Sequence, residues 1–189
     1  SWKNNFDKVL SKRGKSMKPK PSSALPYDEI GPFMERLRDR SGVAALALQF
    51  CILTAARSGE VRGATWGEIN FKKSEWVIPA ARMKAGKEHT VPLAPVAMQI
   101  LKALPRGGPD EIVFKAKRGG MLSDMTLSAV LKRMEVPVTV HGFRSTFRDW
   151  AGETTSFPRE VIEHALAHQL KDKAEAAYAR STLMPKRKR

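Results

Sequence analysis

The sequence predicts an α+β domain that is mainly α-helical and carries a small antiparallel β-sheet. Two patterns support this fold class: apolar residues recur at helical spacing in several segments, whereas residues 69–79 alternate and contain β-branched and aromatic side chains. The chain has 189 residues, which is enough for one domain with a single core. It shows no internal repeat with a period of about 20 to 50 residues.

The first 24 residues differ in composition from the rest of the chain and are expected to form a basic linker. They are rich in lysine, contain a single acid, Asp7, and close with the proline- and serine-rich segment from Pro19 to Ser23. Such a composition is typical of a linker and not of a core element. We therefore expect residues 25–189 to form the domain, and we expect an upstream domain to precede the linker.

Helices are expected along the first part of this domain. Apolar residues at helical spacing predict a helix from Tyr27 to Arg40, with Ser41-Gly42 as its stop signal. The run from Val43 to Ala56 is apolar nearly all round, which predicts a central buried helix. A short helix is expected to follow as far as Ala64, with Ser58 as its cap.

The sheet is expected in the middle of the chain. Residues Ile69 to Pro79 alternate and predict one strand. Residues 82–93 predict a hairpin, because Ala85-Gly86-Lys87 is typical of a turn and Thr90-Val91 of a strand. The remaining segments predict helices at Pro95 to Leu104, Leu122 to Met134 with Ser123 as candidate cap, Gly142 to Trp150, and Pro158 to Ala167.

The charge balance indicates a polyanionic partner. The chain has 34 lysines and arginines against 19 aspartates and glutamates, a formal net charge of +15. This excess is larger than solubility alone favours, and it suits nucleic acid, an anionic membrane surface or an acidic protein. Charge by itself leaves these three classes open.

Cysteine usage and hydropathy favour a reducing compartment. Cys51 is the single cysteine, so no intramolecular disulfide can form. The sequence contains no apolar run of roughly 18 residues and no signal segment at its start. We therefore expect a cytoplasmic protein with no membrane partner, acting on the nucleoid if it is bacterial.

Arg57 follows the expected buried helix and is a candidate phosphate ligand. Its guanidinium would emerge from apolar packing, and Glu60 stands three residues later. A guanidinium fixed in this way can grip a phosphate with two hydrogen bonds. An ion pair between Arg57 and Glu60 at a helix junction explains the same residues without any function.

His141 and Arg144 stand three residues apart at an expected helix start. Unpaired amides and the helix dipole favour an anion there, so Arg144 and the helix end could together hold a phosphate. The alternative is that His141 only caps the helix and that Arg144 is a solvated helical residue.

The remaining candidates are two histidines and a tyrosine. His164 and His168 have the four-residue spacing of metal ligands, but no glutamate follows His164 and no third ligand is evident, so no metal is expected. The scattered acids also disfavour a two-metal nuclease, which leaves metal-free phosphoryl chemistry. Tyr178 lies among alanines, which leaves room for a substrate at its hydroxyl, although without further context a core aromatic residue is the better explanation.

Taken in order, these residues resemble the active site of the tyrosine recombinase or phage integrase family. The similarity runs from about Leu25 to Met184 and is strongest at Thr54 to Glu60, at His141 to Arg144, and at Leu166 to His168 followed by Tyr178. The segments Arg82-Met83-Lys84 and Tyr178-Ala179-Arg180-Ser181 are most similar to the integrases of prophages and genomic islands. The active-site residues implied by the resemblance are Arg57, Lys84, His141, Arg144, His168 and Tyr178.

The resemblance implies the tyrosine-recombinase catalytic fold and site-specific DNA recombination, the integration or excision of a mobile element, with no metal and no cofactor. Tyr178 would attack a DNA phosphate to form a 3′-phosphotyrosine, while Arg57 and Arg144 neutralise the phosphate. Lys84, or Lys87 if the hairpin register is shifted, would protonate the leaving 5′-oxygen.

The resemblance also implies supporting roles and partners. His141 would assist proton transfer from the tyrosine, His168 would donate a hydrogen bond to a phosphate oxygen, and Glu60 would orient Arg57. The expected partners are double-stranded DNA with specific recombination sites and other protomers in a DNA-bound synaptic complex, and the isolated domain is expected to be a monomer. The linker would follow an upstream DNA-binding domain.

Two alternatives and two departures accompany this hypothesis. A type IB topoisomerase has the same chemistry without strand exchange, and a non-catalytic DNA-binding module would have lost one of the six residues, none of which is lost. The family often has glycine where this chain has Ala167, a change expected to be harmless. The few residues after Tyr178 suggest that the family's terminal segment, which often docks on a neighbouring protomer, is absent.

Overall fold

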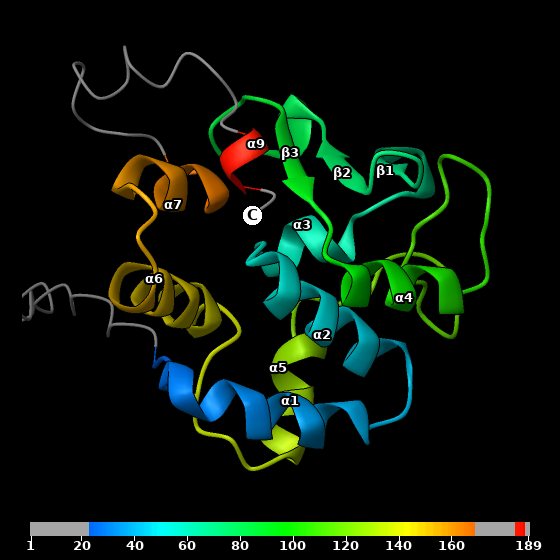
Figure 1. Ribbon diagram of the computed structural model, residues 1–189. Coiled ribbons are helices and arrows are strands. Elements are labelled where there is room, and N and C mark those ends of the chain that lie inside the picture. The colour runs from blue at the N-terminus through cyan, green and yellow to red at the C-terminus, as the bar shows by residue number, and fades with distance from the viewer. Residues whose placement is uncertain (1–22, 169–183, 188–189) are drawn as a thin grey trace, which may run out of the picture.

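The computed structural model describes residues 23–168 and 184–187, and it has the predicted fold class. Helices make up most of the regular structure, and a three-stranded antiparallel sheet lies at one side of them (Figure 1). The helices are α1 Ile30–Arg38, α2 Val43–Thr54, α3 Ser58–Arg62, α4 Pro95–Ala103, α5 Thr126–Arg133, α6 Gly142–Thr154, α7 Arg159–Ala165 and α9 Met184–Arg187, with short 3-10 helices η2 Tyr27–Glu29, η3 Trp66–Glu68 and η4 Ala80–Arg82.

Helix α2 is the centre of the core, as its nearly uniform apolar sequence predicts. It contacts α1, α3, α4 and α5. On the side of the sheet, the fully buried Phe50 packs against Trp76 and Phe114, with ring centroids 5.4 Å apart in each pair. Cys51 is buried in the same helix, and burial raises the pKa of its thiol to about 12, which fits an inert core residue. The central helix therefore fixes the position of its C-terminal end, which leads into Arg57.

The sheet has the order β1-β2-β3, and its details correct the sequence prediction. The single strand predicted from Ile69 to Pro79 is two strands, β1 Ile69–Asn70 and β2 Glu75–Ile78, paired antiparallel through Ile69 and Trp76. A turn separates them because the Asn70 side chain accepts a hydrogen bond from the Lys73 amide (3.0 Å) and Ser74 has a φ of +52°.

The hairpin predicted within residues 82–93 is also wrong. Strand β3 His89–Pro92 pairs with β2, with Trp76 opposite Val91, and residues 79–88 form the connection between these two strands. The connection begins with η4 and not with a strand. Its predicted turn at Ala85-Gly86-Lys87 does lie in an exposed bend, where Gly86 has a φ of +63°.

Two predicted helix caps are wrong as well. The residue that caps α3 is Arg57, whose amide donates to the Glu60 carboxylate (2.8 Å), and Ser58 is the first helical residue. The cap of α5 is Met125 and not Ser123, so this helix begins at Thr126 and not at Leu122, and the Leu122 carbonyl accepts a hydrogen bond from Arg62 Nη1 (2.9 Å).

Residues 23–25 pack along the start of α6. The Ser23 carbonyl accepts a hydrogen bond from the Thr139 amide (3.1 Å), and the Leu25 carbonyl accepts one from the Thr146 hydroxyl (2.6 Å). A Cβ atom on Gly142 would lie 2.0 Å from the Ser23 carbonyl oxygen, so the close approach of the two backbones requires glycine there. The chain thus enters the domain against the helix that carries Arg144.

Helix α9 packs on α7 and lies beside β3 (Figure 1). Arg187 donates to the Thr90 carbonyl (2.7 Å), and burial lowers the pKa of its guanidinium to about 10. A short segment after position 178 therefore docks on its own chain, which the sequence did not predict. No helix within residues 23–168 and 184–187 is both long and apolar enough to cross a membrane.

Candidate active site

Arg57 lies at the junction of α2 and α3, where the local backbone sets its direction. Ala55 ends α2 in the left-handed conformation, with a φ of +49°, and Arg57 is extended before α3 begins. Its Nη1 lies 2.8 Å from Glu60 Oε1, while Glu60 Oε2 accepts the Arg57 amide. The Glu60 side chain is 6% exposed and that of Arg57 is 26% exposed. The predicted ion pair is therefore present, and it leaves part of the guanidinium open to solvent.

Arg144 is buried, with 4% of its surface exposed, so its interpretation as a solvated helical residue is wrong. Its Nη1 donates to the Ala55 carbonyl, and its Nη2 donates to the Leu166 carbonyl (2.5 Å). These carbonyls belong to the residues that cap the C-termini of α2 and α7. Helix C-termini carry partial negative charge, so the guanidinium is held between two of them.

The positive charge of Arg144 is incompletely neutralised. Its Nε is buried and has no hydrogen-bond partner among the residues that the structure describes. Burial and, next, the charge of Arg57 lower the pKa of the guanidinium to about 10, so it remains a cation at neutral pH. Two neighbouring guanidiniums with donor capacity to spare form a site that favours an anion with several oxygens, such as a phosphate.

His168 extends this site from the end of α7. Its Nε2 lies 3.2 Å from Arg144 Nη2, and its Nδ1 donates to Glu163 Oε2 (2.6 Å). A hydrogen bond on one ring nitrogen fixes the orientation of the ring and the role of the other nitrogen. Glu163 therefore aims His168 at Arg144.

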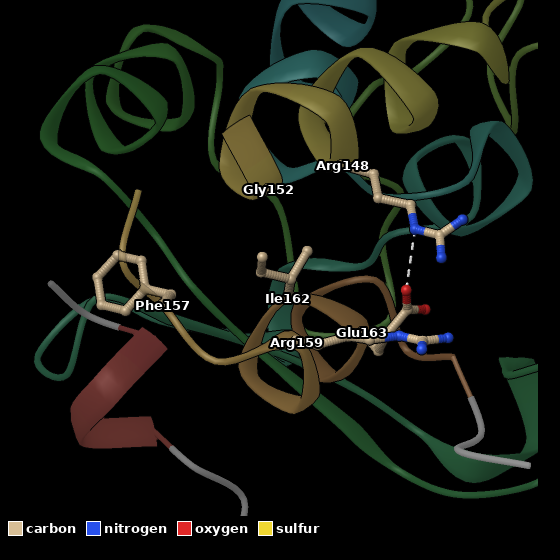
Figure 2. A pocket seen from close by; sticks show the side chains of 6 residues that line it. All are labelled: Arg148, Gly152, Phe157, Arg159, Ile162 and Glu163. Atoms are coloured by element: carbon tan, nitrogen blue, oxygen red, sulfur yellow. Dashed lines mark ion pairs between the residues drawn. The ribbon is translucent and has the colours of Figure 1, made fainter. Parts of the chain in front are cut away.

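Glu163 is a site residue that the sequence reasoning missed. Its side chain is 8% exposed, and its second oxygen, Oε1, lies 2.9 Å from Arg148 Nε on α6 (Figure 2). This ion pair lies at a pocket of about 290 Å³ whose lining also includes Gly152, Phe157 and Ile162. The sequence offered one weak signal for Glu163, which is an acidic residue on a predicted short helix, five positions before His168.

His141 is the N-cap residue of α6, as the alternative interpretation expected, but its side chain makes no capping hydrogen bond. The Thr139 hydroxyl accepts the Gly142 amide instead (3.0 Å). The pKa of His141 is lowered, first by partial burial and then by the positive charges of its neighbours, which in order of effect are Arg144, Arg57, His168 and Lys84. The lowered pKa keeps the imidazole neutral and able to accept a proton.

The same electrostatic effect places Lys84 near the site. Lys84 is exposed in the connection between β2 and β3. Its positive charge contributes to the lowered pKa of His141. Arg57, Lys84, Arg144 and His168 are thus each within electrostatic reach of His141, and Tyr178 lies outside the described residues.

His164, the other histidine considered as a metal ligand, belongs to α7 and lies within electrostatic reach of Arg187. Its pKa is lowered by burial and by Arg187 of α9. The described part of the chain contains no group of three or more histidine, cysteine, aspartate or glutamate residues that could hold a metal ion.

Comparisons with known proteins agree on one family. Residues 24–183 match the model of the phage integrase family. The chain is 35% identical to prophage integrase IntA of Escherichia coli K12 over 190 residues, which cover 97% of this chain and 44% of IntA. It is 33% identical to the integrase of Enterobacteria phage P4, with 82% of this chain and 40% of that protein covered. The chain thus spans less than half the length of these relatives.

Solved structures show the same fold at lower identity. The XerA recombinase superposes with a TM-score of 0.65 at 16% identity, over 94% of this chain and 68% of that one. A lambda integrase tetramer bound to a Holliday junction gives a TM-score of 0.61 at 19% identity, over 84% of this chain and 51% of that one.

Proposed function

Because the chain belongs to the phage integrase family, we propose that it is the catalytic domain of a tyrosine-type site-specific DNA recombinase that integrates or excises a mobile element. The observation that carries the proposal is the position of Arg144, a buried cation whose Nε has no hydrogen-bond partner among the described residues and whose guanidinium lies close to Arg57 and His168. A backbone phosphate of DNA carries several oxygens on one phosphorus atom and can accept hydrogen bonds from such donors.

In the proposed reaction, Arg57 and Arg144 bind the non-bridging oxygens of the phosphate under attack. Both guanidiniums are fixed by protein contacts before DNA arrives: Arg57 by Glu60, and Arg144 by two main-chain carbonyls. Donors held in this way stabilise the extra charge of the five-coordinate transition state without reorganisation, an effect worth about 3 kcal/mol per donor. His168 keeps its Nδ1 hydrogen bond to Glu163 and, when its other ring nitrogen is also protonated, donates from Nε2 to a phosphate oxygen.

The covalent step needs two proton transfers. The Tyr178 oxygen forms a bond to phosphorus as the bond to the 5′-oxygen breaks, which leaves a 3′-phosphotyrosine. The tyrosine proton passes to His141, which the lowered pKa keeps unprotonated and therefore free to accept it. Lys84 protonates the leaving 5′-oxygen, because an alkoxide is a poor leaving group. Attack by a 5′-hydroxyl reverses both transfers and rejoins the strand, so neither an energy source nor a cofactor is required.

The proposed partners follow from charge and from the relatives. A net charge of +15 supports salt-sensitive binding along the DNA backbone. The lambda integrase of similar fold is a tetramer bound to a Holliday junction, which supports assembly of this domain with other protomers on paired recombination sites. We expect the domain without DNA to be a monomer, and its place of action to be the bacterial nucleoid.

Covalent capture tests the proposal. The protein is incubated, in the presence of a chelator, with a pool of nicked duplexes of randomised sequence. Cleavage beside the nick releases a short fragment that diffuses away, so the strand cannot be rejoined and the covalent adduct accumulates. DNA that stays attached to the protein after denaturation in detergent is the expected result. Loss of the adduct on chelation would exclude the metal-free mechanism, and the absence of covalent DNA without chelator would contradict the enzyme proposal.

A further inference from the structure

Arg82 connects three separate segments, η4, η3 and α3. It is the last residue of η4, two positions before Lys84. One guanidinium nitrogen, Nη1, donates to Glu68 Oε1 in η3, and the other, Nη2, donates to the main-chain carbonyl of Glu60 in α3. The planar guanidinium is suited to two acceptors at once, in a way that the point charge of lysine is not.

The acceptor in η3 is itself fixed. The Glu68 side chain is 8% exposed, and its Oε2 accepts a hydrogen bond from Trp76 Nε1 (2.9 Å), which belongs to a fully buried side chain of β2. A buried carboxylate is costly without a cationic partner, and Arg82 supplies one. Charge and burial therefore hold the Arg82 guanidinium at this point.

Gly63, the residue that caps the C-terminus of α3, leaves the space for this guanidinium. A Cβ atom on Gly63 would lie 3.3 Å from Arg82 Nη2 and 3.4 Å from its Cζ, which is closer than ordinary van der Waals contact. The φ of Gly63 is −93°, a value that any residue adopts, so the reason for glycine here is space.

Arg82 is connected to the candidate active site in two ways, through its hydrogen bond to Glu60 and along the chain to Lys84. Glu60, whose carbonyl accepts Arg82, also holds Arg57 through its carboxylate. On the other side of Arg82, Met83 is buried and its carbonyl accepts the Gly86 amide (2.9 Å), so the exposed Lys84 stands between fixed neighbours. Two ion pairs joined by a main-chain hydrogen bond thus link the connection that carries Lys84 with the junction that carries Arg57.

We propose that Arg82 is a positioning residue that holds Lys84 in register with Arg57 for delivery of a proton to the leaving 5′-oxygen. The inference rests on the proposed function, in which Lys84 is the general acid. Loss of the Arg82 bridge would leave phosphate binding by Arg57 and Arg144 in place and would impair proton delivery.

A change of leaving group separates these effects. DNA in which sulfur replaces the bridging 5′-oxygen releases a thiolate, which leaves without a proton because its conjugate acid is far stronger than an alcohol. The substrate is the duplex recovered by covalent capture, made with oxygen or with sulfur at the scissile position. Cleavage rates are compared for the wild type, Arg82→Gln, Lys84→Ala and the matched control Arg118→Gln, which removes one charge from an exposed loop.

We expect Arg82→Gln to cleave the oxygen substrate about 100-fold more slowly than the wild type, a typical general-acid effect. With sulfur, its rate should return to within about threefold of the wild type, as should that of Lys84→Ala. Arg118→Gln should match the wild type on both substrates. Gly63→Ala, whose Cβ crowds the guanidinium without removing it, should show the same rescue after a smaller loss, and it serves as the test if Arg82→Gln does not fold.

Rescue of Lys84→Ala by sulfur without rescue of Arg82→Gln or Gly63→Ala would overturn the positioning role and leave the proposed function standing. Failure of sulfur to rescue Lys84→Ala would instead reject Lys84 as the general acid, and the inference would fall with it.

Discussion

The Arg144 guanidinium donates to the main-chain carbonyl of Ala55, a residue 89 positions earlier in the chain. Through this contact and the one to Leu166, a single side chain joins the C-terminal ends of α2 and α7. Arg144 is therefore a structural residue as well as a candidate phosphate ligand, so its replacement should affect the stability of the fold as well as DNA cleavage.

Replacement of Arg144 by alanine should lower stability more than replacement of Arg57. Arg144→Ala leaves two carbonyls in a buried site without their donor, at a cost of about 2–4 kcal/mol in the free energy of unfolding. Arg57→Ala removes a half-exposed partner of Glu60, which keeps its bond to the residue 57 amide, and should cost about 1 kcal/mol. Urea denaturation measures both variants, and equal losses would contradict the anchoring role of Arg144.

Glycine at position 167 should stabilise the protein. Ala167 has a φ of +50°, in the left-handed region where a Cβ atom is unfavourable, so Ala167→Gly should raise the free energy of unfolding by about 1 kcal/mol. The matched control is Ala129→Gly in the interior of α5, which should lower it by a similar amount. A loss of stability in both variants would show that the left-handed backbone at position 167 carries no strain.

Removal of the Glu163 charge should slow cleavage through His168. Glu163→Gln keeps the shape of the side chain but weakens the hydrogen bond that aims the imidazole, and a rate loss of about 10-fold is expected. The same change in a His168→Asn background should have almost no further effect, because the residue it positions is gone. Multiplicative losses in the double variant would assign Glu163 a role independent of His168.

Stability should depend on the protonation of His89. Burial, and next the charge of Arg187, lower the pKa of His89 from 6.5 to about 4. The unfolded state therefore binds a proton at higher pH than the folded state, so this contribution is complete above pH 6.5 and is lost as the pH falls towards 4. The loss should be about 3 kcal/mol.

The measurement is the free energy of unfolding between pH 7 and 4 for the wild type and for His89→Asn. The variant should have a flatter profile, and the difference between the two curves isolates His89 from the carboxylates that titrate in the same range. Parallel curves would contradict the burial of a neutral His89.

Local patterns predicted the helices but not the details of the sheet. The apolar run of α2 and the periodicity of α1 gave bounds within a few residues of the observed ones. The strand predicted from Ile69 to Pro79 was wrong because the turn within it depends on the Asn70 side chain and on a positive φ at Ser74, neither of which interrupts the alternation of apolar residues.

The candidate site was predictable only where side chains carry the signal. Arg57 and Glu60 are neighbours in sequence, and their ion pair could be anticipated. Arg144 donates to the main-chain carbonyls of residues 55 and 166. Every residue type has such a carbonyl, so the sequence cannot indicate which ones Arg144 contacts. The Arg82 bridge likewise ends on a carbonyl of α3, so only the folded arrangement reveals it.

The central claim, that Tyr178 is the nucleophile, is tested most directly by assigning the DNA adduct to a residue. Phenylalanine removes one oxygen and keeps the ring, so Tyr178→Phe should fold and bind DNA like the wild type. The matched control is Tyr27→Phe, which alters a phenol that is hydrogen-bonded to Glu153 at the start of the domain. Covalent capture on the nicked duplex, followed by nuclease digestion and mass spectrometry, should find a nucleotide on the peptide that contains Tyr178 in the wild type and in Tyr27→Phe, and none in Tyr178→Phe. An adduct that persists in Tyr178→Phe, or that maps to another residue, would contradict the account.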